Sequence, residues 1–301
     1  MATFNRAHFI KDTLESIKNQ TYQNFECLII DDGGQDDTKI VVQELIVEDK
    51  RFSYLVRPNK YKKGLPGCRN YGLDICIGDY IIFFDDDDIV HPDNLLLNLE
   101  ILNDRKLDFS VYQKQPFTTS PEITESSYPQ FIANITTYDI INILENKIPM
   151  ASCTVFWRKS CFNGNRFLED LSYAEEWELY TRMVGSGLSG VMISNVLYYN
   201  RKHAESNTGM YYAGNLKMKK AKAQAIFALW NYFIESHFMT FKLKRYLINK
   251  SYSFSEFITI NEMLQKSNDL KVVSWFWRIY YLTIPTRLFF YRLRRLKFNL
   301  F

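Results

Sequence analysis

Four consecutive aspartates, residues 85–88, are the side chains of this sequence whose type and spacing point most directly to chemistry. They follow an apolar run, residues 80–84, which reads as a short buried strand. Carboxylates crowded at a strand end repel one another and resist dehydration, so they need a counter-charge. A divalent cation supplies that charge and also binds phosphate. The alternative is a solvated acidic turn that leads into a helix near Asp93.

A second pair of carboxylates, Asp31 and Asp32, follows another strand-like run at residues 25–30. The elements between the two acidic groups alternate in type. Helices are predicted after His8, after Asp37 and over residues 65–77, and a strand over 52–56. This alternation predicts an α/β fold in which a parallel sheet is covered by helices on both faces. Both acidic groups then lie at the edge of the sheet where such folds bind ligands.

Several short segments share the order found in one enzyme family: Thr3–Ala7, Ser16–Tyr22, Ile29–Gly33, Arg69–Leu73, Gly78–Asp88 and Pro92–Asp93. With these segments the first half of the chain resembles the family 2 glycosyltransferases, which use nucleotide-sugar donors. The resemblance is complete over residues 2–100 and looser to residue 210. It implies a GT-A (Rossmann-like) α/β fold over residues 1–210, with a mixed, mostly parallel sheet flanked by helices. Residues 211–301 are expected to form a helical extension.

The resemblance implies a metal site in the acidic run. Asp87 would be the direct ligand of a Mg²⁺ or Mn²⁺ ion, and Asp85 and Asp86 would lie close to the metal and the ribose. His203 would complete the coordination or touch the diphosphate, although a lone histidine in a basic loop is as well explained by solvation. Such an ion bridges the diphosphate of the donor and offsets charge on the leaving group.

Donor recognition is assigned by the same resemblance. Asp32, together with Asp31, would accept a hydrogen bond from the N–H of a uracil or thymine base. The backbone at Thr3 and Phe4 would cradle that base. Arg69 would face the nucleotide or diphosphate as a fixed positive donor. The alternative, without the resemblance, is that Arg69 is an ordinary surface residue of a helix.

An acidic pair, Glu175 and Glu176, opens a predicted helix in which Trp177, Tyr180 and Met183 recur at helical spacing. In the family, an aspartate at the place of Glu176 is the general base for the acceptor hydroxyl. One extra methylene lengthens the side chain but keeps the chemistry of a carboxylate. We therefore expect Glu176, ahead of Glu175, to act as the base. The alternative is that both residues only complement the helix dipole.

The N-terminus departs from the family pattern, because only Met1 and Ala2 precede Thr3 where an apolar strand is expected. We expect that strand to be absent and its neighbours to keep unpaired backbone groups. A misplaced start codon or truncated reading frame is the favoured explanation. If the chain is the real product, low stability and weak donor binding are expected.

Composition fits an enzyme with a large core, since 47% of the 301 residues are hydrophobic and the net charge is +3. The five cysteines have no metal-binding spacing and read as core residues of a reducing compartment. No signal peptide is recognised, which predicts a cytoplasmic protein.

The C-terminal segment, residues 271–301, carries basic and aromatic residues but no Asp or Glu. Arg278 and Arg287 interrupt its apolar runs well short of the length of a membrane-spanning helix. This pattern suits the surface of an anionic membrane and predicts a peripheral enzyme on its inner face. The alternative is a helix packed on the domain or on a second subunit. No motif supports nucleic-acid binding.

Together these features predict metal-dependent transfer of a sugar, with inversion, from a nucleotide donor to a hydroxyl of a glycan or lipid-linked acceptor. A UDP-sugar is the expected donor.

Two other classes of protein stay open as alternatives. A sugar nucleotidyltransferase would carry a glycine-rich, lysine-bearing loop near its N-terminus, and none is visible. A non-catalytic remnant of a glycosyltransferase would bind neither Mn²⁺ nor UDP.

Overall fold

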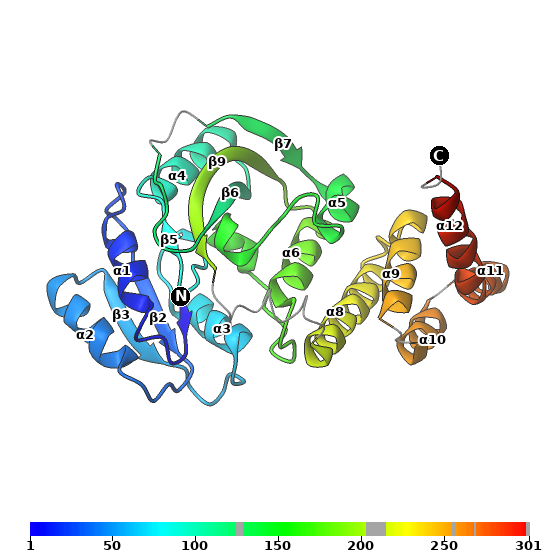
Figure 1. Cartoon of the computed structure of the whole chain (residues 1–301), viewed down its shortest axis with the longest axis horizontal. Helices are drawn as coiled ribbons and strands as arrows, with labels where there is room; N and C mark the ends of the chain where they lie inside the picture. Colours follow the sequence, from blue (N-terminus) through cyan, green and yellow to red (C-terminus); the bar gives the residue numbers. More distant parts are fainter. Residues whose placement is uncertain (125–128, 203–214, 255–256, 268, 299–301) are drawn as a thin grey trace. The chain divides into compact units, whose positions relative to one another are not determined.

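The computed structural model describes residues 1–124, 129–202, 215–254, 257–267 and 269–298. It divides into two compact units, Met1–Ala221 and Lys222–Phe301. The first unit contains β-sheets and helices, and the described part of the second is helical (Figure 1). The α/β fold predicted for the first part of the chain is therefore confirmed. The boundary expected near residue 210 lies outside the described residues.

The first sheet is parallel and has the strand order β1-β2-β3. Helices alternate with its strands as the sequence predicts, and α1 buries Ile10, Leu14 and Ile17 in the core that it shares with β2 and β3. Since the strands are parallel, their carboxyl ends meet at one edge, where Asp31 lies. The elements of this region are β1 (Ala2–Thr3), α1 (Ile10–Lys18), β2 (Cys27–Asp31), α2 (Thr38–Glu48), β3 (Phe52–Val56) and α3 (Leu65–Ile75).

The strand that we expected to be absent before the Thr3 segment is present in part. Ala2 and Thr3 form β1 and pair in parallel with Ile30 and Asp31 of β2. The Met1 ammonium adds a further bond, donating to the Leu28 carbonyl at 2.9 Å. The expectation of complete absence is thus wrong: a short β1 pairs with β2 and positions Thr3 beside Asp31.

The second sheet has six strands, in the order β4-β8-β6-β9-β5 with β7 also paired to β9. Among the described strands of this sheet, only β6 and β9 pair in parallel. The expected parallel character therefore holds for the first sheet, whereas the second is mainly antiparallel. The strands are β4 (Tyr80–Ile81), β5 (Ile89–Val90), β6 (Phe109–Phe117), β7 (Phe131–Ile135), β8 (Val155–Arg158) and β9 (Gly190–Arg201).

Helix α6 (Glu175–Gly185) packs on the second sheet through an apolar face. Its Tyr180 is fully buried, and the ring centroid lies 5.0 Å from that of Trp157 on β8. The helix begins at Glu175, so both glutamates of the acidic pair lie in its first turn. The other helices of the unit are α4 (Asn94–Arg105) and α5 (Ile140–Leu144), with short 3₁₀ turns at Thr137–Asp139, Ser152–Thr154 and Lys159–Phe162.

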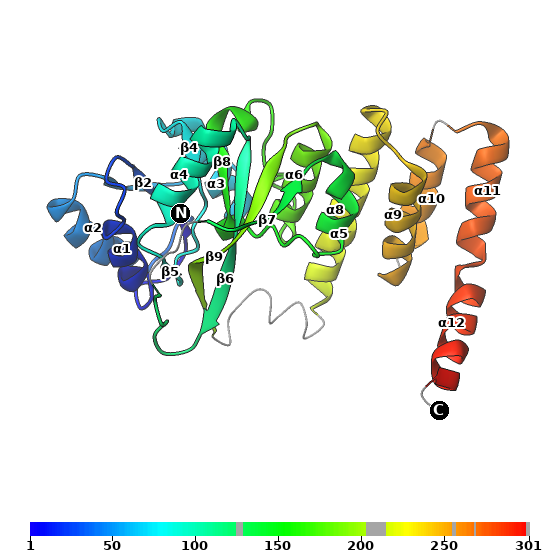
Figure 2. The ribbon, with the colours of Figure 1, turned by 90° about the horizontal axis from the view of Figure 1, so that it is seen from above.

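The second unit is built from successive helices (Figure 2). Trp277 is buried within it, with its ring 4.8 Å from that of Phe241 and with the Lys244 ammonium 5.4 Å from the ring centroid. Across the described residues no helix has the length and apolar character needed to cross a membrane. The helices are α8 (Leu216–Glu235), which begins in the first unit, α9 (Phe241–Ser253), α10 (Phe257–Lys266), α11 (Lys271–Leu282) and α12 (Ile284–Phe298).

Candidate active site

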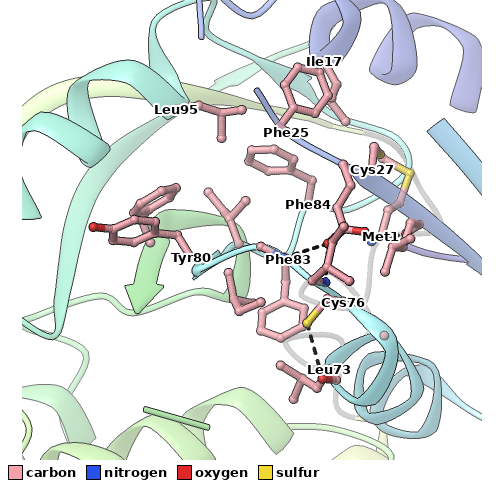
Figure 3. Close-up of a pocket in the computed structure, with 18 of the residues that line it drawn as sticks. Met1, Ile17, Phe25, Cys27, Leu73, Cys76, Tyr80, Phe83, Phe84 and Leu95 are labelled. Atoms are coloured by element: carbon pink, nitrogen blue, oxygen red, sulfur yellow. Dashed lines mark hydrogen bonds between the residues drawn. The ribbon is translucent and has the colours of Figure 1, made fainter. Parts of the chain in front are cut away.

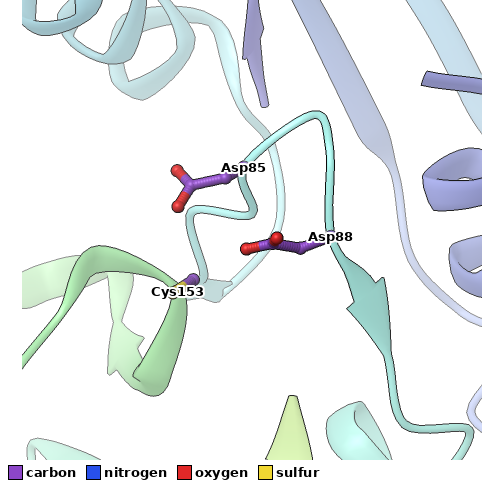
Figure 4. Close-up of side chains that lie close together, drawn as sticks. All are labelled: Asp85, Asp88 and Cys153. Atoms are coloured by element: carbon purple, nitrogen blue, oxygen red, sulfur yellow. The ribbon is translucent and has the colours of Figure 1, made fainter. Parts of the chain in front are cut away.

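The acidic run forms the loop between β4 and β5, and two of its carboxylates converge. Ligand atoms of Asp85, Asp88 and the Cys153 thiol all lie within 4.8 Å of one another (Figure 4). Asp88 is buried and accepts the backbone N–H of Arg201 at 2.7 Å. Burial raises the pKa of the Cys153 thiol, so it stays protonated and is a weak ligand. The carboxylates are thus the oxygen donors that Mg²⁺ and Mn²⁺ prefer.

Burial disfavours the ionised form of two carboxylates in this loop. Burial, opposed in part by Thr3, raises the pKa of Asp86 to about 7. Burial and the neighbouring Asp85 raise the pKa of Asp88 to about 8. A group whose ionised form is destabilised by burial and by like charges is stabilised when a cation binds. The described residues of the loop therefore fit a divalent cation, and the burial of Asp86 and Asp88 argues against the alternative of a solvated acidic turn.

Asp87 lies in the same loop but outside the converging cluster. Its carboxylate is 3.9 Å from the Arg6 guanidinium, which is also 3.6 Å from the carboxylate of Asp86. The Arg201 Nε–H donates to the Asp87 carbonyl at 2.9 Å and holds the loop backbone. His203 lies outside the described residues. The assignment of Asp87 and His203 as metal ligands therefore stays a prediction.

Arg69 contacts two of the site residues predicted from the sequence, Glu175 and Asp85. Its guanidinium donates to the carboxylate of Glu175 at 2.9 Å and lies 3.4 Å from that of Asp85. A third bond, at 2.8 Å, goes to the Ser152 hydroxyl. The side chain is only 4% exposed, so the alternative of an ordinary surface residue is wrong. Arg69 therefore fixes the position of the acidic loop relative to the start of α6.

The variant Arg69→Met is expected to lower the free energy of unfolding by about 3–5 kcal/mol, because it leaves Glu175 buried without its partner. Urea denaturation measures the loss. The double variant Arg69→Met with Glu175→Gln removes the orphaned charge and should recover part of it. A single variant within about 1 kcal/mol of the native protein would contradict a structural ion pair.

The two glutamates that open α6 have different surroundings. Glu175 is 5% exposed and is engaged by Arg69. Burial, followed by the neighbouring Glu176, raises the pKa of Glu175 to about 8. Glu176 is half-buried. Because the carboxylate of Glu175 is bound to Arg69, Glu176 is the carboxylate of the two that is better placed to accept a proton from a substrate.

The carboxyl end of β2 holds its two aspartates in different ways. The buried Asp31 accepts the backbone N–H groups of Gly33 and Gly34 at 3.0 and 2.7 Å, and also the hydroxyl of Tyr54. Asp31 therefore shapes the turn. Asp32 accepts the Nε–H of Arg57 at 2.5 Å, which fixes its carboxylate, only 12% exposed, at the same edge.

The end of β1 lies beside these aspartates. Thr3 is buried and in register with Asp31, whereas the side chain of Phe4 is 45% exposed. The Lys63 ammonium lies 4.9 Å from the centroid of the Phe4 ring. The structure thus brings Thr3, Phe4 and the Asp31–Asp32 pair to one edge, as the sequence analysis expected.

Sequence reasoning missed residues that reach the site from loops and from β6. Arg6, Arg57 and Ser152 contact the predicted carboxylates or Arg69. Neighbouring Cys153, opposed by burial and supported by Asp85 and Asp88, raises the pKa of Lys114, which makes this β6 residue a further candidate for the site. Single residues of these types carry no spacing signal, so only the fold could find them.

A comparison with protein-family models places the chain in a family. The model of glycosyl transferase family 2 matches residues 1–163. This match covers more than half of the chain, and it includes β1 to β8, the acidic loop and Arg69. The chain therefore belongs to glycosyl transferase family 2, and the resemblance seen in the sequence is confirmed.

A curated relative is the GalNAc(5)-diNAcBac-PP-undecaprenol beta-1,3-glucosyltransferase of Campylobacter jejuni. It is 43% identical over 86 residues, which are 29% of this chain and 28% of the relative. The chain spans between 28% and 30% of the length of the first curated relatives that it matches.

Two solved structures share the fold. TarS 1–349 of S. aureus in complex with UDP-GlcNAc has a TM-score of 0.60 and 18% identity, covering 84% of this chain and 78% of that one. The mannosyltransferase PcManGT of Pyrobaculum calidifontis, in complex with GDP-Man and Mn2+, has a TM-score of 0.55 and 14% identity, covering 96% and 81%. At such identities the likeness shows the fold alone, and the GT-A expectation is confirmed.

Proposed function

We propose that this chain transfers a sugar from a nucleotide donor, a UDP-sugar, to a hydroxyl of a glycan or lipid-linked acceptor, with a divalent metal and with inversion. The observation that carries the proposal is the bridge made by Arg69. One buried guanidinium contacts Asp85 of the acidic loop and Glu175 at the start of α6. The acidic loop that would hold the metal and the helix start that carries Glu176, next to Glu175, are thus both tied to the same residue.

The residues have distinct roles in this proposal. Asp85, Asp87 and Asp88 hold Mg²⁺ or Mn²⁺, with His203 as a further ligand. When bound, that ion stabilises the charge that develops on the leaving diphosphate. Asp86 lies close to the metal and the ribose. Arg69 orients Asp85 and faces the diphosphate.

The base and acceptor are handled by other groups. Asp32, on the turn shaped by Asp31, accepts the N–H of a uracil base, and the backbone at Thr3 and Phe4 lies against that base. Glu176 takes the proton of the acceptor hydroxyl as the oxygen attacks the sugar on the face opposite the diphosphate. A single displacement of this kind inverts the configuration of the sugar.

Known proteins of similar sequence or fold support the substrate classes. The name of the C. jejuni relative describes transfer of glucose to an undecaprenyl-diphosphate-linked glycan. The similar fold of S. aureus TarS binds UDP-GlcNAc, and that of PcManGT binds GDP-Man and Mn2+. The N–H of a uracil base suits the acceptor-only chemistry of the Asp32 carboxylate, and so do the N–H groups of guanine, so a panel of donors must separate the two bases.

Donor binding and transfer test the proposal. Calorimetry should show UDP binding that depends on Mn²⁺, and a panel of UDP-glucose, UDP-GlcNAc and GDP-mannose should reveal one substrate with a lipid-linked acceptor. If the protein binds neither Mn²⁺ nor UDP, it is a non-catalytic remnant. Release of pyrophosphate from a nucleoside triphosphate and a sugar phosphate would instead identify a nucleotidyltransferase.

We also propose that the second unit holds the enzyme on the inner face of the cell membrane. Its helices α11 and α12 expose large apolar side chains, among them Trp275, Leu282 and Phe290 at 67%, 70% and 58%. The basic residues Lys271 and Arg278 share this region, which suits an anionic bilayer.

Vesicle sedimentation tests this placement. The native protein should sediment with vesicles that contain phosphatidylglycerol and much less with phosphatidylcholine alone. The variant Trp275→Ser with Phe290→Ser should lose at least about ten-fold in affinity, since each buried aromatic contributes on the order of 1–3 kcal/mol. A matched change at Tyr138, an exposed aromatic of the first unit, should leave binding intact. Equal binding to both lipids would contradict electrostatic attachment.

A further inference from the structure

Arg6 faces the two aspartates in the middle of the acidic run. Its guanidinium lies 3.6 Å from the carboxylate of Asp86 and 3.9 Å from that of Asp87. The outer two aspartates, Asp85 and Asp88, converge on one another instead. A single arginine therefore faces both of the carboxylates that lie outside the converging cluster.

The backbone that carries Arg6 is held against the loop that follows β2. Asn5 has a φ of 55°, in the left-handed region, and its side-chain oxygen accepts the N–H of Gln35 at 2.8 Å. The N–H of Arg6 donates to the hydroxyl of Thr38 at 2.9 Å, and its carbonyl accepts the N–H of Ile10 at 3.0 Å. Uncommon backbone conformations that are held in this way gather at functional sites. The position of Arg6 is thus fixed at its backbone, and only its side chain can move toward a ligand.

Two other arginines contact the acidic loop in the described part of the chain, and both are more buried. Arg69 is bound to Glu175 and its side chain is 4% exposed. Arg201 donates to a carbonyl of the loop and to the carboxylate of Asp12, and its side chain is 13% exposed. The side chain of Arg6 is 23% exposed. Of these three arginines, Arg6 is the one that a ligand can reach most easily from solvent.

The cavity beside Met1 does not supply such a contact. It has a volume of about 490 Å³, and its lining is mostly apolar, with Phe25, Leu73 and Phe84 among the lining residues (Figure 3). Neither Arg6 nor any of the four aspartates lines it. A diphosphate buried among apolar groups would lose its hydration without gaining polar partners. The charge of a donor is therefore met at the other end of β1, where Arg6 follows the strand.

Arg6 and a divalent ion would compete for the same carboxylates. In the proposed reaction Asp87 is a metal ligand and Asp86 lies close to the metal. An ion bound there repels the guanidinium and replaces it as the counter-charge. A diphosphate removes this conflict, because a guanidinium binds two phosphate oxygens through parallel N–H bonds.

We propose that Arg6 is a further donor-binding residue, which neutralises Asp86 and Asp87 while the site holds no metal and binds the donor diphosphate once a divalent ion takes up these carboxylates. The metal and the donor then strengthen each other's binding, because the metal releases the guanidinium and the diphosphate accepts it. This inference rests on the proposed function, since it uses the metal and the diphosphate of that reaction.

Calorimetry on the full chain tests the inference through the variant Arg6→Gln. With Mn²⁺ alone, the variant should bind the ion about five-fold more tightly than the native protein, because a competing positive charge is gone. At saturating Mn²⁺ it should bind UDP at least about ten-fold more weakly, because a charge-assisted contact to the diphosphate is lost. The opposite signs of the two changes separate a role in coupling from damage to the site, which would weaken both.

Two further variants serve as controls. Arg6→Lys keeps the charge but loses the planar fork, so its affinity for Mn²⁺ alone should stay near native while UDP binds about three-fold or more weakly. Arg105→Gln removes an exposed arginine at the end of α4 and should change neither affinity.

The outcomes distinguish this inference from the proposed function. If Arg6→Gln binds Mn²⁺ alone no more tightly than the native protein, or binds UDP as well as the native protein does, the role of Arg6 is overturned and the proposed function stands. If the native protein and every variant bind neither Mn²⁺ nor UDP, both are overturned.

Discussion

Replacement of Asp87 by alanine is expected to lower the rate of sugar transfer by about a thousand-fold or more while the protein stays folded. The proposed reaction needs a divalent ion opposite the leaving diphosphate, and Asp87 is the ligand assigned by the family motif. Its carboxylate faces Arg6 across 3.9 Å. Removing it therefore costs little packing but takes away a donor to the metal. Initial rates at saturating Mn²⁺ and donor measure the loss.

The matched control for this change is Asp104→Ala, which removes an exposed aspartate from α4. This variant should transfer sugar at the native rate. Chelation of divalent ions with EDTA should reproduce the defect of Asp87→Ala in the native protein, and added Mn²⁺ should reverse it. An Asp87→Ala rate within about ten-fold of native would show that another group holds the metal, and the cluster of Asp85 and Asp88 would be the first candidate.

The order of elements in the first sheet could be predicted because the signals are local. Residues 52–56 form β3 as expected, and α6 begins at Glu175, the first residue of the acidic pair. Apolar periodicity, a proline in the first turn of α3 and the acidic first turn of α6 each act within one element. Such signals do not depend on distant parts of the chain.

Pairings between distant segments could not be predicted in the same way. The bond between Arg69 and Glu175 spans 106 positions, and that between Arg201 and Asp88 spans 113. The second sheet is mainly antiparallel because β8 and β9 return beside β4, β6 and β5. Residues 82–84 leave the strand early, although their apolar pattern predicted five residues, since β4 pairs only with β8 among the described strands.

The acidic groups show which parts of the site can be predicted from residue type alone. Residue type alone does not separate Asp31 from Asp32, yet Asp31 accepts the backbone N–H groups of the turn and Asp32 accepts the Nε–H of Arg57. Similarly, the run of aspartates does not show that Asp85 and Asp88 meet at Cys153, because a loop can present any pair of its side chains. The path of the backbone determines which of these carboxylates converge, and that path depends on the strands of the two sheets on either side of each loop.

The variant Glu176→Gln is expected to lower kcat by about 10²–10⁴-fold and to leave donor affinity unchanged. The amide keeps the shape of the side chain but cannot take the proton of the acceptor hydroxyl. Glu175 cannot replace it, because its carboxylate is buried and bound to Arg69. Steady-state kinetics with the acceptor, together with calorimetry of UDP and Mn²⁺, separate the chemical step from donor binding.

The neighbouring glutamate provides the control. Glu175→Gln weakens the ion pair with Arg69, so it should lower stability and disturb donor binding together with turnover, whereas Glu176→Gln should affect turnover alone. If Glu175→Gln affects turnover alone and Glu176→Gln affects stability, donor binding and turnover together, then Glu175 is the base and its ion pair with Arg69 holds its carboxylate in place. If Glu176→Gln reduces donor affinity and kcat equally, Glu176 supports the structure of the site, and the proton must leave the acceptor by another group.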